Sequence, residues 1–228
     1  MRFAPGSPQP VVVFTGAFGS GKTEVAVNYA RSARLAGLPT CIVDLDVVTP
    51  YFRVGNLRAE LQQAGLQVVA PEGSLASFEL PSLPPEIAGA LAEPSLHVVV
   101  DVGGDPVGAR LLRVYRERIS ARSHELWLVV NPFRPSAATP EAVAEQARAI
   151  EAEAGLHITG IVANPNLGMA TRPSDVRRGL ETIQRAAEQL AVPVVLLAIA
   201  RHVAEPEPLP SLPFLRLELV LRLPWESV

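Results

Sequence analysis

The chain has 228 residues and a formal net charge of −3; 48% of the residues are hydrophobic and 19% are charged. This length fits one domain with a sizeable core, and the composition excludes a disordered chain. One cysteine, Cys41, excludes an intramolecular disulfide framework, and the lack of a basic excess gives no reason to expect nucleic acid as a partner. Apolar runs are too short to span a bilayer, and prolines interrupt residues 1–10, so we expect a cytoplasmic protein with no membrane anchor.

Apolar runs rich in β-branched residues alternate with longer segments at helical spacing. Strands are predicted at 10–15, 40–45, 66–70, 96–102, 125–130, 158–163 and 194–199. Helices are predicted at 22–36, 54–64, 106–119, 140–154 and 175–190, with Thr139 and Ser174 as N-caps of the last two. Continuous apolar strands separated by helices predict an α/β fold, with a mostly parallel central sheet and helices on both faces.

Two proline-rich segments interrupt the alternation. Residues 71–94 form an irregular excursion, with one short helix predicted near 86–91. After a second proline-rich stretch, leucines alternate with other residues over 214–223. A period of two predicts an edge strand with one buried face, whereas a membrane-binding amphipathic helix needs a period near 3.6.

The chain's only lysine lies in a glycine-rich motif. Lys22 stands in GAFGSGKT, which matches G-x-x-x-x-G-K-[ST], follows a predicted strand and opens a predicted helix. Backbone N–H groups of such a loop bind phosphates, the lysine reaches the β- and γ-phosphates, and the hydroxyl of Thr23 would ligate Mg²⁺. The alternative is a glycine-rich turn without a ligand. The predicted nucleotide-binding residues of the loop are Gly16, Ala17, Phe18, Gly19, Ser20, Gly21, Lys22 and Thr23.

An acidic residue ends a strongly apolar predicted strand. Asp101 follows HVVV and stands where ligands bind to open α/β sheets, at the carboxyl end of a central strand. We predict that Asp101 is a second anchor for Mg²⁺ and that Gly103 and Gly104 let the backbone approach the γ-phosphate. The alternative is an aspartate that caps the next helix, for which Asp105 is better placed.

A pair of aspartates ends the second predicted strand. Asp44 and Asp46 are two residues apart, so their side chains share a face of an extended chain. We predict that Asp44 belongs to the metal site and that Asp46 is catalytic and orients the attacking water. Ordinary turn chemistry at a strand end is the competing explanation.

Together these motifs resemble the SIMIBI branch of P-loop NTPases that contains the MinD, ParA, CobQ and CobB ATPases. The likeness covers about residues 10–200, and the phrases DLDVVTPYFR and DVGGDPVGARLL resemble uncharacterised bacterial ATP-binding proteins within that branch. The resemblance implies a Walker B role for Asp101 and a water- and Mg²⁺-positioning segment at Asp44 and Asp46. It also implies that Asn164 contacts adenine.

The sequence departs from that branch at the loop. Many members carry a second lysine after the first glycine, which acts across an ATP-bridged homodimer, but this chain has Ala17 there. A homodimer that switches hydrolysis is therefore in doubt unless an arginine such as Arg53 substitutes. The guanine-reading motif N-K-x-D is absent, because Asn131 and Asn164 are each followed by proline, so ATP is favoured over GTP.

Other candidates carry less chemistry. Four histidines, at 97, 124, 157 and 202, lack metal-ligand spacing, and three of them precede apolar strands, where a solvated position is the usual explanation. Arg110, Arg113, Arg116 and Arg118 fit a solvated helix face, although Arg113 and Arg116 could meet an acidic partner. Tyr51, Phe52 and Arg53 follow the aspartate pair. They form either a mobile switch segment or a segment whose two aromatic residues belong to the core.

The sequence thus favours an ATP-binding, Mg²⁺-dependent NTPase that hydrolyses ATP to control an unknown protein or small-molecule partner. Two alternatives stay open. One is an ATP-dependent phosphotransferase or ligase of the dethiobiotin-synthetase kind, with its substrate near residues 80–94. The other is a nucleotide-bound scaffold with negligible turnover, which the missing second lysine favours.

Overall fold

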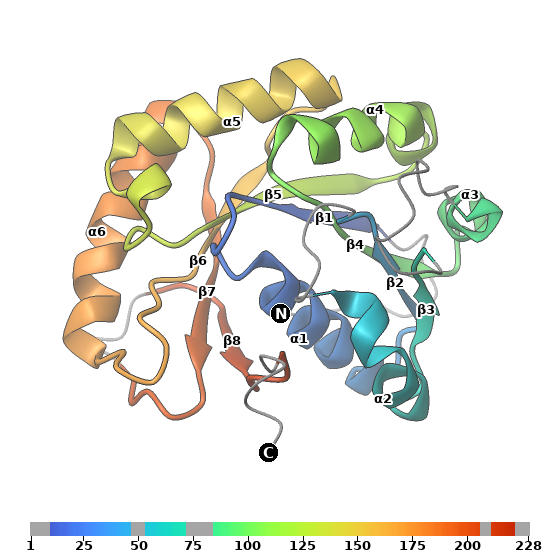
Figure 1. Ribbon diagram of the computed structural model, residues 1–228, viewed down its shortest axis with the longest axis horizontal. Coiled ribbons are helices and arrows are strands. Elements are labelled where there is room, and N and C mark those ends of the chain that lie inside the picture. Colours follow the sequence, from blue (N-terminus) through green and yellow to red (C-terminus); the bar gives the residue numbers. More distant parts are fainter. Residues whose placement is uncertain (1–9, 47–52, 72–83, 206–210, 222–228) are drawn as a thin grey trace, which may run out of the picture.

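The computed structural model describes residues 10–46, 53–71, 84–205 and 211–221. In these residues, parallel strands form one sheet in the order β3-β2-β4-β1-β5-β6-β7-β8 (Figure 1). The strands are β1 (Val11–Thr15), β2 (Thr40–Asp44), β3 (Gln67–Val69), β4 (His97–Asp101), β5 (His124–Val130), β6 (Gly160–Ala163), β7 (Val194–Ala200) and β8 (Phe214–Leu217). The helices are α1 (Lys22–Leu35), η1 (Val54–Leu57), α2 (Arg58–Gln63), α3 (Pro85–Ala92), α4 (Pro106–Ser120), η2 (Pro135–Ala137), α5 (Pro140–Ala154) and α6 (Pro173–Leu190).

Helices cover both faces of the sheet, as the apolar strands predicted. Helices α1 and α2 lie on one face, and α3, α4, α5 and α6 lie on the other (Figure 1). Alternate residues of β1 enter the two cores, with Phe14 packing against Tyr29 of α1 and Val13 joining the cluster that contains Leu112 of α4. Because β1 is buried on both faces, its sequence is continuously apolar rather than alternating.

The strand order gathers the predicted site at one edge of the sheet. Strand β1 lies between β4 and β5, and β2 pairs with β4 on its other side. Asp44 is the register partner of Asp101, which also pairs with Phe14 near the end of β1. The carboxyl ends of β1, β2 and β4, distant in sequence, therefore meet.

The C-terminal strand is shorter than predicted. Strand β8 lies at the sheet edge and buries Leu215 and Leu217, but it ends there, and Leu219 is 44% exposed. Glu218 pairs instead with a helix side chain: its N–H donates to Oδ1 of Asn28, and its carbonyl accepts from Nδ2 of Asn28. The buried face predicted over 214–223 therefore stops at Leu217 within the described residues.

Helix termini were predicted with mixed success. Thr139 caps α5, accepting a hydrogen bond from the N–H of Ala142 at 3.2 Å, as predicted. The cap predicted for α6 at Ser174 is wrong, because the helix begins at Pro173 and its N-cap is Arg172. The carboxylate of Asp175 accepts the backbone N–H of Arg172, which fixes the start of the helix two residues earlier. Within the described residues, no helix combines the length and apolarity needed to cross a membrane.

The expectation of solvated histidines at strand starts is wrong for His97. This side chain is fully buried at the first residue of β4, with its ring centroid 5.8 Å from that of Tyr29. Burial lowers the pKa of His97 to about 4, and the charge of Arg122 acts in the same direction, against a hydrogen bond with the backbone of Pro10. His157 and His202, by contrast, are exposed.

Candidate functional site: the loop between β1 and α1

The glycine-rich motif forms the turn from β1 to α1, so the strand and helix that it requires are both present. Gly21 is the N-cap of α1 with φ of 84°, and a Cβ atom there would lie 2.3 Å from Nδ2 of Asn164. Both constraints select glycine. Gly21 also has no side chain to cap α1, and the uncapped first amides of a helix are the donors that bind phosphate.

Three hydrogen bonds fix the loop. The N–H of Ser20 donates to the carbonyl of Ala17 at 3.0 Å, Nδ2 of Asn164 donates to the carbonyl of Ser20 at 2.7 Å, and Nε of Arg134 donates to the carbonyl of Gly19 at 3.0 Å. Asn164 is only 2% exposed. The structure therefore gives its amide nitrogen a role beneath the loop, and the adenine contact remains a prediction.

Lys22 and Asp46 form a buried ion pair. Nζ of Lys22 lies 2.6 Å from Oδ2 of Asp46, and the two side chains are 8% and 1% exposed. Burial disfavours the ammonium ion, but the carboxylates of Asp101, Asp46 and Asp105 outweigh that effect, so the pKa of Lys22 is raised. The single lysine thus stands in a strongly negative environment.

Asp101 is the most deeply buried of these carboxylates. It is fully enclosed, and neither oxygen accepts a well-formed hydrogen bond from a described residue, although the Thr23 side chain is close enough to lower its pKa. Burial dominates and raises the pKa of Asp101 to about 7, against the attraction of Lys22. A buried oxygen pair without donors, next to a hydroxyl, is chemically suited to a hard cation.

Asp44 is engaged by the backbone. Oδ1 accepts the N–H of Asp46, and Oδ2 accepts the N–H of Gly55 in η1, both at 3.1 Å. Burial raises the pKa of Asp44 to about 6, and these two hydrogen bonds oppose that shift. Asp44 therefore ties the end of β2 to η1. Its role as a metal ligand stays a prediction.

No group of three or more His, Cys, Asp or Glu side chains among the described residues is arranged to hold a metal ion. Magnesium at nucleotide sites is held by one or two protein oxygens together with the phosphates and water. The pair of Thr23 and Asp101 fits that mode and does not fit a metal site made of protein ligands alone.

The loop after β4 packs directly on the glycine-rich motif. A Cβ atom on Gly104 would lie 2.4 Å from the carbonyl oxygen of Gly16, so only glycine allows this approach. Asp105 accepts the N–H of Gly108 at 3.0 Å and so caps α4, as predicted. Gly104 thus lies beside the first residue of the loop.

A cavity of about 490 Å³ opens from the loop. One end is formed by loop and helix residues, including Lys22 and Thr23. Other parts are lined by Asn131, by Asn166 and by Leu219 from the segment after β8. Glu24 is the one carboxylate among the described lining residues. Its Oε1 and Oε2 accept the N–H groups of Val220 and Leu221 at 2.6 and 3.3 Å, and burial raises its pKa to about 7.

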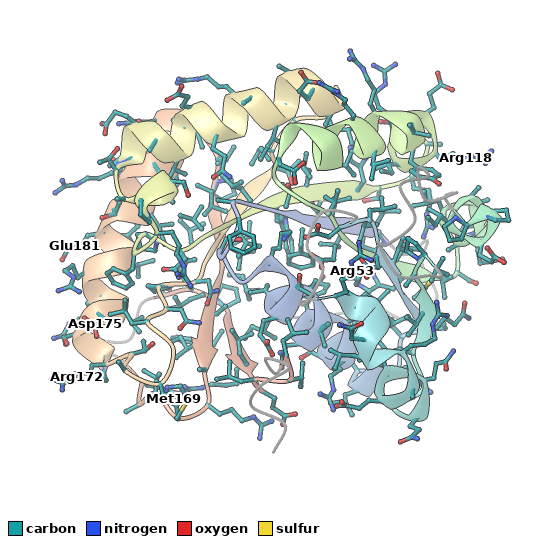
Figure 2. The ribbon with its side chains drawn as sticks, in the orientation of Figure 1. Arg53, Arg118, Met169, Arg172, Asp175 and Glu181 are labelled. Atoms are coloured by element: carbon teal, nitrogen blue, oxygen red, sulfur yellow. The ribbon has the colours of Figure 1, made fainter. Side chains whose placement is uncertain are left out.

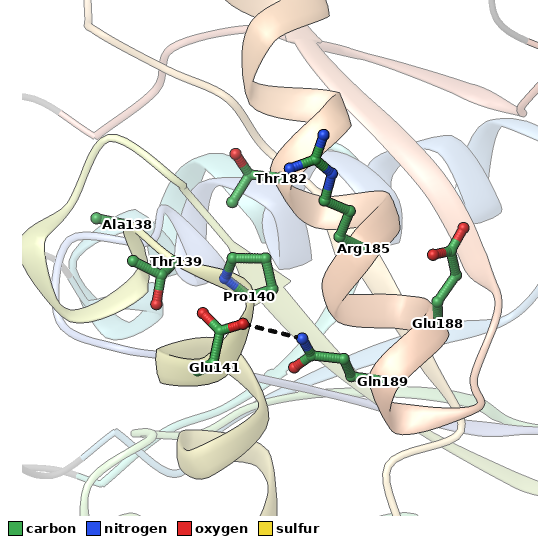
Figure 3. A pocket seen from close by; sticks show the side chains of 8 residues that line it. All are labelled: Ala138, Thr139, Pro140, Glu141, Thr182, Arg185, Glu188 and Gln189. Atoms are coloured by element: carbon green, nitrogen blue, oxygen red, sulfur yellow. Dashed lines mark hydrogen bonds between the residues drawn. The ribbon is translucent and has the colours of Figure 1, made fainter.

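A second hollow, of about 770 Å³, lies between the start of α5 and α6 (Figure 3). Its polar groups are mainly exposed, and Nε2 of Gln189 donates to the Glu141 carboxylate across it at 3.1 Å. The phosphate-binding loop does not line it. Although this second hollow is larger, we regard the cavity at the loop as the candidate site.

Sequence reasoning missed three parts of the site. Arg134 and Leu219 are distant in sequence, and only folding brings them to the loop, whereas Glu24 directly follows the motif but is not part of it. Of the predicted switch segment, Arg53 is described and precedes η1 (Figure 2). Burial raises the pKa of Asp44, and the charge of Arg53 is one of the effects that oppose this rise. Tyr51 and Phe52 lie outside the described residues, as do residues 72–83 of the excursion 71–94.

No protein-family model matches the chain, and no curated protein matches it. Solved structures do. Cell division protein FtsY from Thermotoga maritima aligns with a TM-score of 0.57 at 18% identity, covering 86% of this chain and 63% of that one. Chloroplast FtsY from Physcomitrella patens aligns with a TM-score of 0.58 at 19% identity, covering 86% of this chain and 61% of that one. The signal recognition particle 54 kDa protein from Aeropyrum pernix K1, solved with GDP, aligns with a TM-score of 0.56 at 20% identity. The match covers 84% of this chain and 41% of that one.

At identities of 18–20%, these likenesses show the fold alone. The fold of this chain is accordingly the α/β fold of the P-loop NTPases, as the sequence predicted. The chain spans less than two thirds of the length of each of the three.

Proposed function

We propose that the chain binds ATP with Mg²⁺ and hydrolyses it, and that its nucleotide state controls a partner or an assembly step in the cytoplasm. The observation that carries this proposal is a cluster of buried charged groups at the loop: Lys22, paired with Asp46, lies beside the carboxylate of Asp101, whose oxygens accept no well-formed hydrogen bond from a described residue. Charged groups are rarely buried in this way unless a ligand or a reaction uses them.

The residues have distinct proposed roles. Loop amides from Gly16 to Thr23 bind the phosphates, and Lys22 exchanges Asp46 for the β- and γ-phosphate oxygens. Thr23, Asp44 and Asp101 would hold Mg²⁺, which would neutralise phosphate charge. Released from Lys22, Asp46 orients a water molecule for attack.

The choice of ATP over GTP rests on hydrogen bonding in the cavity. Guanine presents N1–H and N2–H donors that need a carboxylate acceptor, and Glu24 already accepts two backbone N–H groups. Asn131 is also engaged, since its Oδ1 accepts from Phe133 and Asn166 and its Nδ2 donates to the carbonyl of Asn166. These commitments support adenine as the base.

Titration calorimetry with MgATP tests the proposal. Wild-type protein should bind, and Lys22→Ala should not. Because Lys22→Ala removes the ammonium group that pairs with Asp46, the double variant Lys22→Ala/Asp46→Asn serves as a second, electrically balanced test of the same loss. Arg185→Ala, which removes a cation from the hollow between α5 and α6, is the matched control and should bind like wild type.

Two further measurements separate the finer parts of the proposal. GTP competing as well as ATP would overturn the base assignment. Phosphate release that needs Mg²⁺ would support hydrolysis, whereas tight binding without turnover would favour a nucleotide-bound scaffold. Ala17 offers no charge to a second copy, so we expect the rate to be independent of protein concentration.

A further inference from the structure

The segment after β8 is the feature of the cavity that no motif accounts for. Residues 218–221 leave the sheet edge and run along α1, the helix that begins with Lys22. Their side chains alternate: Val220 packs against the core cluster that contains Tyr29, and Leu219 and Leu221 line the cavity. Leu219 is 44% exposed and lines the cavity, so part of its side chain is available to a ligand there.

Two side chains of α1, one helical turn apart, hold this segment. Asn28 is 5% exposed and makes two hydrogen bonds with the backbone of Glu218, at 2.9 and 3.0 Å. Glu24 accepts the next two available N–H groups, those of Val220 and Leu221. The side chain of Glu218 adds ion pairs with Arg201 at 2.9 Å and Arg31 at 3.6 Å.

These contacts place an apolar surface in the same cavity as the proposed phosphate-binding residues. Glu24 directly follows Lys22 and Thr23, so the first turn of α1 faces the loop with one side and the C-terminal segment with another. A nucleotide with its phosphates on the loop would extend its sugar and base into the rest of the cavity. The apolar lining found there includes Leu219 and Leu221.

We propose that residues 218–221 form the apolar wall of a base subsite, in which Leu219 packs on the purine ring and Asn28 is the residue that positions the wall. This inference rests on the proposed nucleotide-binding function and deepens it. A flat purine and an aliphatic side chain exclude water from each other without hydrogen bonds. The wall therefore supplies affinity, and the polar groups elsewhere in the cavity supply base choice.

The experiment compares a ligand that has a base with one that lacks it. Affinities for MgATP and for magnesium tripolyphosphate are measured by calorimetry on the 228-residue wild type, Leu219→Ala, Asn28→Ala and the control Leu35→Ala. Leu35 is an 89% exposed leucine at the far end of α1, so its loss removes a similar side chain away from the cavity. Thermal unfolding of each variant verifies that it is folded.

Leu219→Ala should weaken MgATP about tenfold, as expected for the loss of a partly buried leucine contact, and leave tripolyphosphate unchanged. Asn28→Ala should show the same split, a pattern that general destabilisation would not produce. Leu35→Ala should match wild type for both ligands.

Unchanged MgATP affinity in Leu219→Ala would overturn the inference, as would an equal loss for both ligands. If wild type binds tripolyphosphate but gains nothing from the base, the wall is wrong and the phosphate site stands. If wild type binds neither ligand, the proposed function itself fails.

Discussion

At the scale of single residues, the buried pair of Lys22 and Asp46 decides both stability and chemistry. Removing one partner of a buried ion pair leaves the other uncompensated, which typically costs about 3 kcal/mol or more. We therefore expect Lys22→Met to lower the free energy of unfolding by about 3 kcal/mol in urea titrations. Lys22→Met/Asp46→Asn should recover most of that loss. Additive losses in the double variant would show that the two side chains are not coupled.

Asp46→Asn separates binding from turnover. The amide keeps the size and hydrogen bonding of the side chain but removes the charge that would polarise water. We expect MgATP affinity to be retained and the rate of phosphate release to fall about 10² to 10⁴-fold. Asp101→Asn should instead weaken the Mg²⁺ dependence of binding. A wild-type rate in Asp46→Asn would return the aspartate to simple strand-end turn chemistry.

At the scale of elements, the contact between the loop after β4 and the loop after β1 can be tested by one substitution. Gly104→Ala would place a methyl group against the backbone of Gly16, where no flexible side chain can yield. We expect the loops to separate, with a loss of more than tenfold in MgATP affinity and a loss of stability of about 1 to 3 kcal/mol. Calorimetry measures the MgATP affinity, and urea titration measures the stability.

Gly89→Ala provides the matched control for that substitution. Gly89 lies inside α3, and a Cβ atom there would meet nothing within 4 Å. The alanine should stabilise the protein by about 0.5 to 1 kcal/mol, because glycine is a poor helix former, and should leave nucleotide affinity unchanged. A similar effect of both substitutions on nucleotide affinity would contradict the loop contact.

The elements that local sequence specifies were predicted well. Strands and helices follow from apolar period and capping, so β1, β4, α1 and α5 lie within a residue or so of their predicted bounds. The phosphate-binding loop was equally local. Errors arose where a distant partner decides the outcome: Asn28 stops β8, and the carboxylate of Asp175 moves the start of α6.

The contrast between local patterns and distant contacts also explains which parts of the candidate site were predicted. Motif spacing located Lys22, Asp46 and Asp101, and the strand order then brought them together. The partners of Asn164 and the lining by Leu219 depend on contacts across more than 140 residues of sequence, which no local pattern encodes. The burial of His97 was missed for a related reason, since the aromatic side chain that covers it comes from α1.

At the scale of the whole molecule, His97 makes stability depend on pH. Its pKa is about 4 in the folded protein and near 6.5 when unfolded, so the unfolded chain binds the proton more readily between these values. Its contribution is complete above pH 6.5 and is lost as the pH falls toward 4. From pH 7 to pH 5 the loss should be about 2 kcal/mol.

His97→Phe isolates this contribution. Asp44 and Asp101 have raised pKa values, about 6 and about 7, and titrate with the opposite sign over the same range. The quantity to compare is therefore the difference between wild type and variant in urea unfolding at pH 7 and pH 5. A difference that does not change with pH would show that His97 titrates normally in the fold.

The hydrogen bonds between α1 and the C-terminal segment also impose an order of assembly. Asn28 and Glu218 are 190 residues apart, and β8 pairs with β7 at the far edge of the sheet. During synthesis, the phosphate-binding loop, Asp46 and Asp101 leave the ribosome long before residues 218–221 are made. A nascent chain can thus assemble the proposed phosphate site before the segment after β8, which we propose meets the base, has been made.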